Sequence, residues 1–116
     1  MEGEKLMETL KCDFCLEDTT LVAVLSGTLD HHSARGAREA IDREIVDCSA
    51  RRLVLELSSV EFMDSAGIGL ILGRYNKIGE RGGELVLRSP SEAVSRLMRL
   101  SGVDRFIIVE RAESKK

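Results

Sequence analysis

The chain has 116 residues, of which 43% are hydrophobic and 32% are charged, and its formal net charge is −3. This length and balance are typical of one folded domain and exclude a disordered chain. The acidic charge and the absence of tryptophan argue against a nucleic-acid-binding protein, which needs a basic face. No apolar run approaches the roughly 18 residues of a membrane span, and the polar N-terminus is unlike a signal peptide. We therefore expect a cytoplasmic protein that contacts neither nucleic acid nor membrane.

The three cysteines do not form a disulfide framework or a complete metal-binding pattern. Cys12 and Cys15 make a single CxxC, but they fall in an alternating strand, where an odd spacing places two side chains on opposite faces. Only Cys48, His31 and His32 remain as further soft ligands, and a zinc site needs a more complete set. We therefore predict no metal and no cofactor bound by this chain.

The first two predicted elements form a hairpin. Between residues 6 and 16 apolar side chains alternate with polar ones, which is typical of a half-buried strand. A continuous apolar run at 21–25 predicts a second, more buried strand. The polar connection at 17–20 is too short for a parallel crossover, so we expect the two strands to be antiparallel.

A helix is predicted after the segment 27–32, with Ser33 as its N-cap. Its apolar stripe comprises Ala34, Ala37, Ile41, Ile45 and Cys48. Its remaining faces carry Arg35, Arg38, Glu39, Asp42 and Arg43. The adjacent His31 and His32 precede this helix. Their residue type alone favours a solvated loop over metal binding or general-base catalysis, because no carboxylate cluster at ligand spacing accompanies them.

The most informative stretch is 60–69, which lies between a buried strand predicted at 53–57 and a helix predicted over 65–80. Asp64 and Ser65 should therefore lie at a helix N-terminus. The first backbone N–H groups of a helix lack partners, and the helix dipole makes this end positive. Serine is a favoured N-cap. The junction therefore suits an anion, or a hydroxyl that becomes one.

The glycines of this helix need a reason, because glycine is a poor helix former. For Gly67 and Gly69, in the first turns, the predicted reason is that something approaches the backbone closely. Gly69 and Gly73 stand four apart on one face, where small residues would allow close packing against the sheet. The helix is expected to end at a glycine-rich C-cap formed by Gly79, Gly82 and Gly83.

The last helix is predicted from a capping box, with Ser89 at the N-cap, Pro90 at N1 and Glu92 at N3. Gly102 is expected to end it. Its buried side is predicted to comprise Ala93, Val94, Leu97, Met98 and either Leu100 or Ser101.

The strands at 84–88 and 106–109 complete the order strand, strand, helix, strand, helix, strand, helix, strand. Strands separated by helices imply right-handed parallel crossovers. We therefore predict an α/β fold in a single domain over 1–116, with residues 110–116 as a frayed tail. Its mixed sheet has about five strands, with an N-terminal antiparallel hairpin strand, the rest mostly parallel, and three main helices.

Enzymatic interpretations of the 60–69 stretch fail on their motifs. A serine hydrolase needs a glycine two residues before its nucleophile, where Met63 stands before Ser65, and both histidines lie upstream. No phosphate-binding loop is present. Gly67, Gly69 and Gly73 miss the dinucleotide fingerprint by one residue, which leaves only a weak case for nucleotide binding. We predict that the chain is not an enzyme.

Two strings resemble a known family. Phe-Met-Asp-Ser-Ala-Gly-Ile-Gly at 62–69, followed by Leu-Ile-Leu-Gly-Arg-Tyr, closely resembles the signature of the STAS-domain anti-sigma factor antagonists. A second family string, Gly-Thr-Leu-Asp-His-His, occurs at 27–32. The similarity spans most of the chain, and both strings occur at compatible spacing.

The resemblance implies a function and a set of site residues. Ser65 would be phosphorylated by an anti-sigma factor that is also a serine kinase, which binds the ATP and Mg²⁺, and a serine phosphatase would reset it. The unphosphorylated form would bind the anti-sigma factor and free the sigma factor. The implied partner contacts are Asp30, His31, His32, Asp64, Ser65, Ala66 and Gly67. The alternative is a STAS-type accessory subunit of a transporter or a sensory complex, because a fold does not fix a function.

Overall fold

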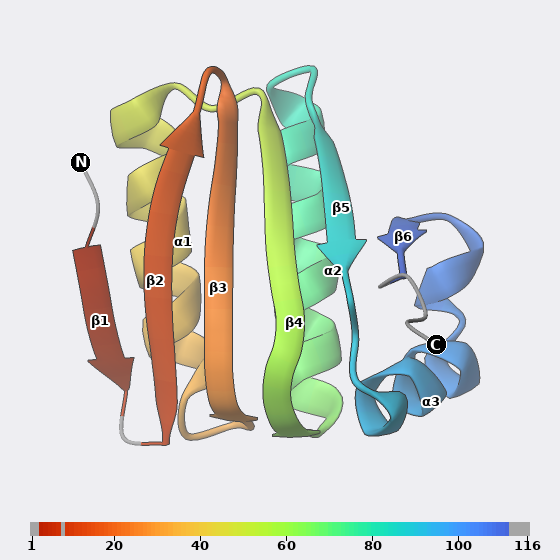
Figure 1. Cartoon of the computed structure of the whole chain (residues 1–116). Helices are drawn as coiled ribbons and strands as arrows, with labels where there is room; N and C mark the ends of the chain where they lie inside the picture. Colours follow the sequence, from red (N-terminus) through yellow and green to blue (C-terminus); the bar gives the residue numbers. More distant parts are fainter. Residues whose placement is uncertain (1–2, 8, 112–116) are drawn as a thin grey trace, which may run out of the picture.

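The computed structural model describes residues 3–7 and 9–111, with residues 3–7 through their backbone only. Within these residues the chain forms a six-stranded sheet whose spatial order follows the sequence (Figure 1). Its strands are β1 (Gly3–Met7), β2 (Leu10–Glu17), β3 (Thr20–Leu29), β4 (Arg52–Met63), β5 (Glu84–Arg88) and β6 (Ile108–Glu110). The pairs β1–β2 and β2–β3 are antiparallel and the later pairs are parallel. This confirms the predicted mixed α/β sheet.

The N-terminal segment departs from the prediction. The alternating run at 6–16, predicted as one strand, is divided between β1 and β2, which pair antiparallel with Met7 opposite Leu10. The alternation gave no sign of this reversal, because the apolar residues on either side of it share the same parity. The hairpin between β2 and β3 is as predicted, with Glu17 opposite Thr20.

Strands β3 and β4 both extend further than their apolar runs indicated. Their parallel pairing continues to Leu29 and Met63, with register shifts between Val24 and Ser26 and between Gly27 and Thr28. Such bulges interrupt the two-residue alternation from which strands are recognised. The longer strands bring the loop after β3 and the start of the helix that follows β4 to the same end of the sheet.

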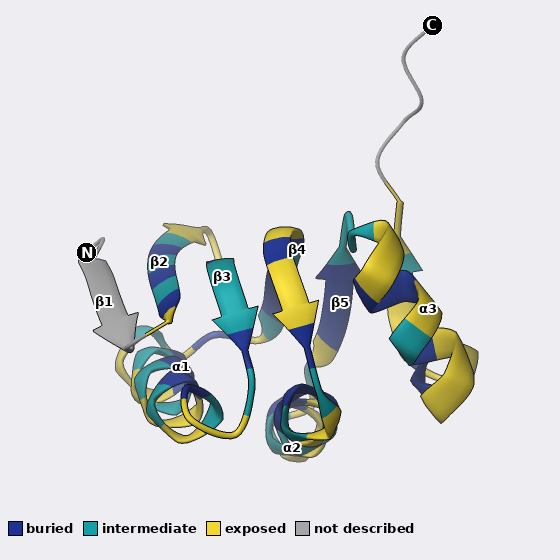
Figure 2. Cartoon of the chain, turned by 90° about the horizontal axis from the view of Figure 1, so that it is seen from below, coloured by how far each residue is buried: buried dark blue, intermediate teal, exposed yellow. Residues whose placement is uncertain are grey.

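Two helices cover one face of the sheet, as Figure 2 shows from below. Helix α1 (Ala34–Cys48) buries Ala37, Ile41 and Ile45 completely, as its predicted stripe required. Helix α2 (Ser65–Glu80) matches the predicted bounds and buries Ile71 and Ile78. Between these helices and the sheet lies an aliphatic core that includes Leu25, Leu55, Leu57 and Leu87. Burial of these side chains is the main source of stability in such a fold.

Helix α3 (Glu92–Ser101) lies beyond β5 and begins later than predicted (Figure 1). Its N-cap is Ser91, whose hydroxyl donates to the Val60 carbonyl at 3.1 Å and accepts from Val94 N. Ser89 instead adopts a positive φ of 53° in the preceding turn, so the predicted capping box is wrong. The helix ends at Gly102, as expected. A 3₁₀ turn, η1 (Val103–Arg105), leads to β6.

The later start also changes the buried side of α3. Val94, Ser95 and Met98 are buried, whereas Leu100 is 77% exposed and Ala93 is also exposed.

The prediction of a frayed tail over 110–116 is wrong at its first residue, because Glu110 belongs to β6 and pairs with Arg88. Residues 112–116 lie outside the described residues. No helix in the described part of the chain is long and apolar enough to cross a membrane.

The face of the sheet opposite α1 and α2 carries a row of valines across β3, β4 and β5, formed by Val22, Val54 and Val86. Ion pairs surround this row. Arg52 contacts Glu84 at 2.8 Å and Glu110 at 3.6 Å, and Arg88 contacts Glu110 at 3.3 Å. Arg52 and Glu110 lie on opposite sides of the row, so their ion pair spans it. Val54 and Val86 are accordingly completely buried.

Candidate functional site

Ser65 is exposed at the end of the sheet, as the first residue of α2. The residue before it, Asp64, is extended (φ −114°, ψ −166°) and is the N-cap. Its Oδ1 accepts a hydrogen bond from the Ala66 backbone N–H at 2.8 Å. The sequence favoured a serine as cap, and the structure assigns that role to the aspartate. Within the described residues the Ser65 hydroxyl makes no hydrogen bond, so it remains available to solvent.

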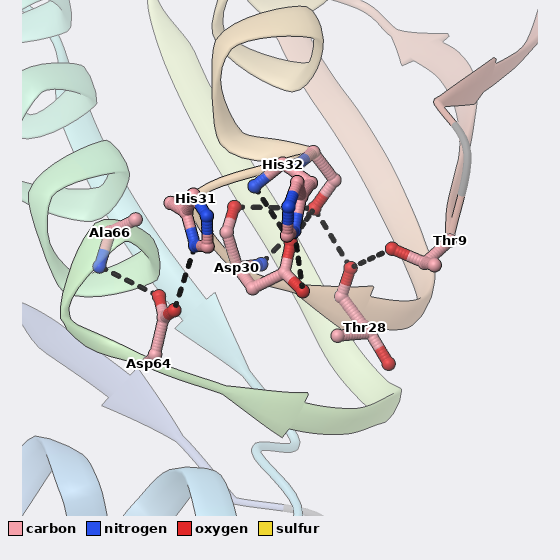
Figure 3. A network of polar contacts seen from close by, with 8 residues as sticks. Thr9, Thr28, Asp30, His31, His32, Asp64 and Ala66 are labelled. Atoms are coloured by element: carbon pink, nitrogen blue, oxygen red, sulfur yellow. Dashed lines mark hydrogen bonds and ion pairs between the residues drawn. The ribbon is translucent and has the colours of Figure 1, made fainter.

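The loop between β3 and α1 is fixed by its own polar contacts (Figure 3). The Asp30 Oδ1 accepts hydrogen bonds from the backbone N–H groups of His32 at 2.9 Å and Ser33 at 3.2 Å. The buried Ser33 hydroxyl donates to the Thr28 carbonyl at 2.9 Å and accepts from Asp30 N. Ser33 occupies the N-cap position of α1, but its side chain does not cap the helix. Its hydroxyl stabilises the loop instead.

The carboxyl of Asp30 is held in its ionised form. Partial burial works to raise its pKa, but the hydrogen bonds from His32 and Ser33 and the nearby His32 ring outweigh that effect, so the pKa lies below its ordinary value of 3.8. A charged acceptor strengthens the two backbone hydrogen bonds it receives. The loop is therefore ordered by a local charge.

His31 connects this loop to the start of α2. Its Nδ1 lies 4.0 Å from Asp64 Oδ2, and its side chain is 72% exposed. The His32 Nδ1 lies 3.7 Å from Asp30 Oδ2, and the two imidazole rings are 3.9 Å apart. Figure 3 shows the loop and the α2 N-terminus side by side. The structure thus brings together five of the predicted contact residues, Asp30, His31, His32, Asp64 and Ala66, beside Ser65.

Gly67 differs from these residues because it is buried, on the inner side of the first turn of α2. A Cβ at this residue would collide with Met63 Cγ, would lie 2.9 Å from Met63 Sδ and would lie 3.3 Å from Leu29 Cγ. The predicted close approach to the backbone is therefore real, and the group that approaches belongs to this chain. Its role as a partner contact stays a prediction.

The prediction that Gly69 and Gly73 pack against the sheet is wrong. A Cβ at either residue would meet nothing within 4 Å. Both residues line a groove between α1 and α2 with a volume of about 750 Å³. We name this groove, lined by Arg35, Arg38 and Arg74 together with Gly69, Gly73, Ala34, Ala66, Leu70 and His31, the arginine groove.

Arg74 is the buried member of the arginine groove, with 5% of its surface exposed. Its Nε lies 3.0 Å from Asp42 Oδ1, but within the described residues neither Nε nor Nη1 forms a hydrogen bond. Burial lowers the pKa of this guanidinium, Asp42 opposes the change, and the like charge of Arg38 adds to it. This groove was not predicted from the sequence. An arginine among the apolar positions 71, 72, 75 and 78 of a helix was the one available signal.

Comparison with known proteins agrees with this geometry. Residues 16–115 match the model of the STAS domain family. An anti-sigma F factor antagonist of Paenibacillus polymyxa is 41% identical over 87 residues, which cover 75% of this chain and 74% of that protein. An anti-sigma factor antagonist of Mycobacterium paratuberculosis has a similar solved structure, with a TM-score of 0.81, 26% identity, and coverage of 93% and 91% of the two chains.

The phosphorylated form of SpoIIAA, a Bacillus cell fate determinant, is also similar, with a TM-score of 0.65, 25% identity, and coverage of 94% and 90%. The matched family model covers most of this chain. The chain therefore belongs to the STAS-domain family, in the group whose members are named anti-sigma factor antagonists.

Proposed function

We propose that this protein is a cytoplasmic anti-sigma factor antagonist whose binding is switched by phosphorylation of Ser65. In the unmodified state it docks the α2 N-terminus and the β3–α1 loop onto an anti-sigma factor, and the sigma factor held there is released. The anti-sigma factor is also a serine kinase. The exposed hydroxyl of Ser65, free of internal hydrogen bonds in the described structure, is the observation that carries this proposal.

The phosphoryl transfer needs only an acceptor oxygen from this chain. The Ser65 oxygen forms a bond to the γ-phosphorus of ATP, the bond from that phosphorus to ADP breaks, and the hydroxyl proton passes to a base on the kinase. The kinase holds the ATP and its Mg²⁺. A separate serine phosphatase later hydrolyses the phosphoserine and restores the docking surface.

The switch follows from local electrostatics. A phosphate adds about −1.5 to −2 units of charge at neutral pH. At a helix N-terminus this charge is favourable within the molecule, so we expect the fold to persist. At an interface the same group is hydrated and lies beside the carboxylate of Asp64, so binding a partner would require its desolvation. Each tenfold loss of affinity corresponds to about 1.4 kcal/mol.

The relatives support this proposal in two ways. The Paenibacillus polymyxa protein, at 41% identity, is named an antagonist of anti-sigma F factor. The SpoIIAA structure with a TM-score of 0.65 was solved in its phosphorylated form. The N-cap assignment adds a structural reason. The Asp64 side chain caps the helix, so the Ser65 hydroxyl is not needed as a cap.

Intact-mass measurement tests the proposal. The protein is incubated with the candidate kinase and ATP, and the modified residue is mapped. We expect one phosphate on the wild type and on the Ser59→Ala control, which removes another exposed serine, and none on Ser65→Ala. Ser65→Ala should still bind the anti-sigma factor, whereas Ser65→Asp should bind weakly and remain folded. Phosphate on the Ser65→Ala variant would overturn the site assignment, and co-purification with a membrane complex in place of a kinase would favour the accessory-subunit alternative.

A further inference from the structure

The charged side chains that line the arginine groove are basic. Among the described residues that line it are Arg35, Arg38 and Arg74, and none is acidic. Three carboxylates contact lining residues: Glu39 lies 3.5 Å from Arg35, Asp42 lies 3.0 Å from Arg74, and Asp64 lies 4.0 Å from His31. Arg38 is exposed and forms no ion pair within the described part of the chain. This local charge stands out in a chain whose net charge is −3.

Arg74 gives the groove a fixed component. A guanidinium with only 5% of its surface exposed is expensive to bury unless it is paired and fully hydrogen-bonded. Asp42 supplies an ion pair at 3.0 Å, but neither Nε nor Nη1 of Arg74 forms a hydrogen bond in the described structure. The nearby Arg38 adds a like charge that disfavours the same guanidinium. A negative charge beside Arg38 would offset this like-charge effect.

The floor of the groove is bare helix backbone. Gly69 and Gly73 are four residues apart, so they lie on the same face of α2, and a Cβ at either would meet nothing within 4 Å. Each glycine weakens the helix relative to alanine, and internal packing does not require either one. Their absence of side chains lets another chain lie close to α2 between the arginines.

The groove also continues from the proposed docking surface. His31 and Ala66 line it and also belong to the contacts beside Ser65. We propose that the arginine groove binds an acidic segment of the protein partner, whose carboxylates pair with Arg35 and Arg38 while its backbone lies over the two glycines. The identity of that partner as the anti-sigma factor rests on the proposed function. Arginine suits this role because its planar guanidinium pairs with carboxylates through two parallel hydrogen bonds.

An acidic occupant also accounts for the direction of the switch. Phosphate on Ser65 would place about two negative charges one residue from Ala66, at the mouth of the groove. These charges repel the entering carboxylates and compete with them for the arginines. Modification would then weaken docking without a change of fold.

Charge reversal at matched arginines tests the groove. Arg38→Glu alters the groove, whereas Arg43→Glu makes the same change at an exposed arginine of α1 that does not line it. We expect Arg38→Glu to weaken binding of the anti-sigma factor by about tenfold or more, and Arg43→Glu to change it by less than about twofold. Added salt should weaken wild-type binding more than binding of Arg38→Glu. Equal effects of the two variants, or no effect of either, would overturn the proposal.

A second experiment tests whether the arginine groove binds acidic peptides, and it does not depend on the proposed function. A short poly-glutamate peptide is titrated into the ¹⁵N-labelled full chain at low salt, with poly-lysine and inorganic phosphate as controls. The expected result is a shift of the Gly69 and Gly73 amide signals by poly-glutamate alone, lost in Arg38→Glu. Unmoved glycine signals, or equal shifts with phosphate, would overturn the acidic-segment proposal. If the wild type binds no anti-sigma factor but these shifts appear, the proposed function is wrong, and the proposal that the arginine groove binds an acidic segment is still supported.

Discussion

Alanine substitution at two neighbouring glycines of α2 should change stability in opposite directions. At Gly69 the added methyl meets nothing within 4 Å, so only the higher helix propensity of alanine acts. That propensity should stabilise the protein by about 1 kcal/mol. For a domain of this size the melting temperature should rise by about 4 °C.

At Gly67 the same methyl collides with Met63 and lies 3.3 Å from Leu29 Cγ. Met63 is 7% exposed and Leu29 is completely buried, so the added methyl would enter the packed core. Overpacking of a core costs up to about 3 kcal/mol. After subtraction of the gain of about 1 kcal/mol from helix propensity, the net loss should be about 2 kcal/mol, or about 8 °C in melting temperature.

Differential scanning calorimetry of wild type, Gly67→Ala and Gly69→Ala in one buffer measures both effects. A Gly67→Ala protein that melts at or above the wild-type temperature would refute the packing described for the first turn of α2. A Gly69→Ala protein that is more stable but binds the partner less well would separate the role of this glycine in docking from any role in folding.

Three further predictions concern individual groups of the site and the sheet. Asp64→Ala should lose the N-cap of α2 and about 1 kcal/mol of unfolding free energy in urea titrations, while Asp64→Asn should retain most of it. Because the folded pKa of Asp30 lies below 3.8, its ionised form should stabilise the fold above about pH 4, with this contribution lost as the pH falls through the folded pKa. In Asp30→Asn the unfolding free energy should accordingly fall less steeply over that acidic range. Burial and the neighbouring Asp13 raise the pKa of Cys12 to about 12, so iodoacetamide should modify the more accessible Cys15 in the native protein and Cys12 only after unfolding. Mass mapping measures the alkylation of each cysteine in the native protein. If Cys12 reacted as fast as Cys15, the burial of Cys12 in β2 would be contradicted.

The elements that could be predicted from sequence are those whose signals are local. The bounds of α2 followed from its apolar spacing, although its C-cap is Arg81 and not one of the predicted glycines. The stripe of α1 led to the three alanine and isoleucine positions that are buried. The start of α3 was missed because a tertiary contact decides it. Ser91 bonds both to its own helix and to the Val60 carbonyl, and Ser89 is used in the turn.

The candidate site shows the same division. Asp64 and Ser65 could be placed at the junction from the sequence, but the choice of the cap between them depends on backbone angles that residue type does not determine. The arginine groove depends on the relative placement of α1 and α2. Arg35 and Arg38 could be placed only outside the apolar stripe of α1, and they come close to Arg74 only after the two helices pack on the same sheet.

The ion pairs over the valine row have a consequence for behaviour in concentrated solution. An uncovered apolar stripe on a flat sheet invites face-to-face stacking between copies. Here Arg52 and Glu110 lie across that stripe and keep it from neighbouring molecules. Neutral substitutions at Arg52 and Glu110 should therefore expose the valine row and favour aggregation, although both residues lie far from Ser65 in the sequence.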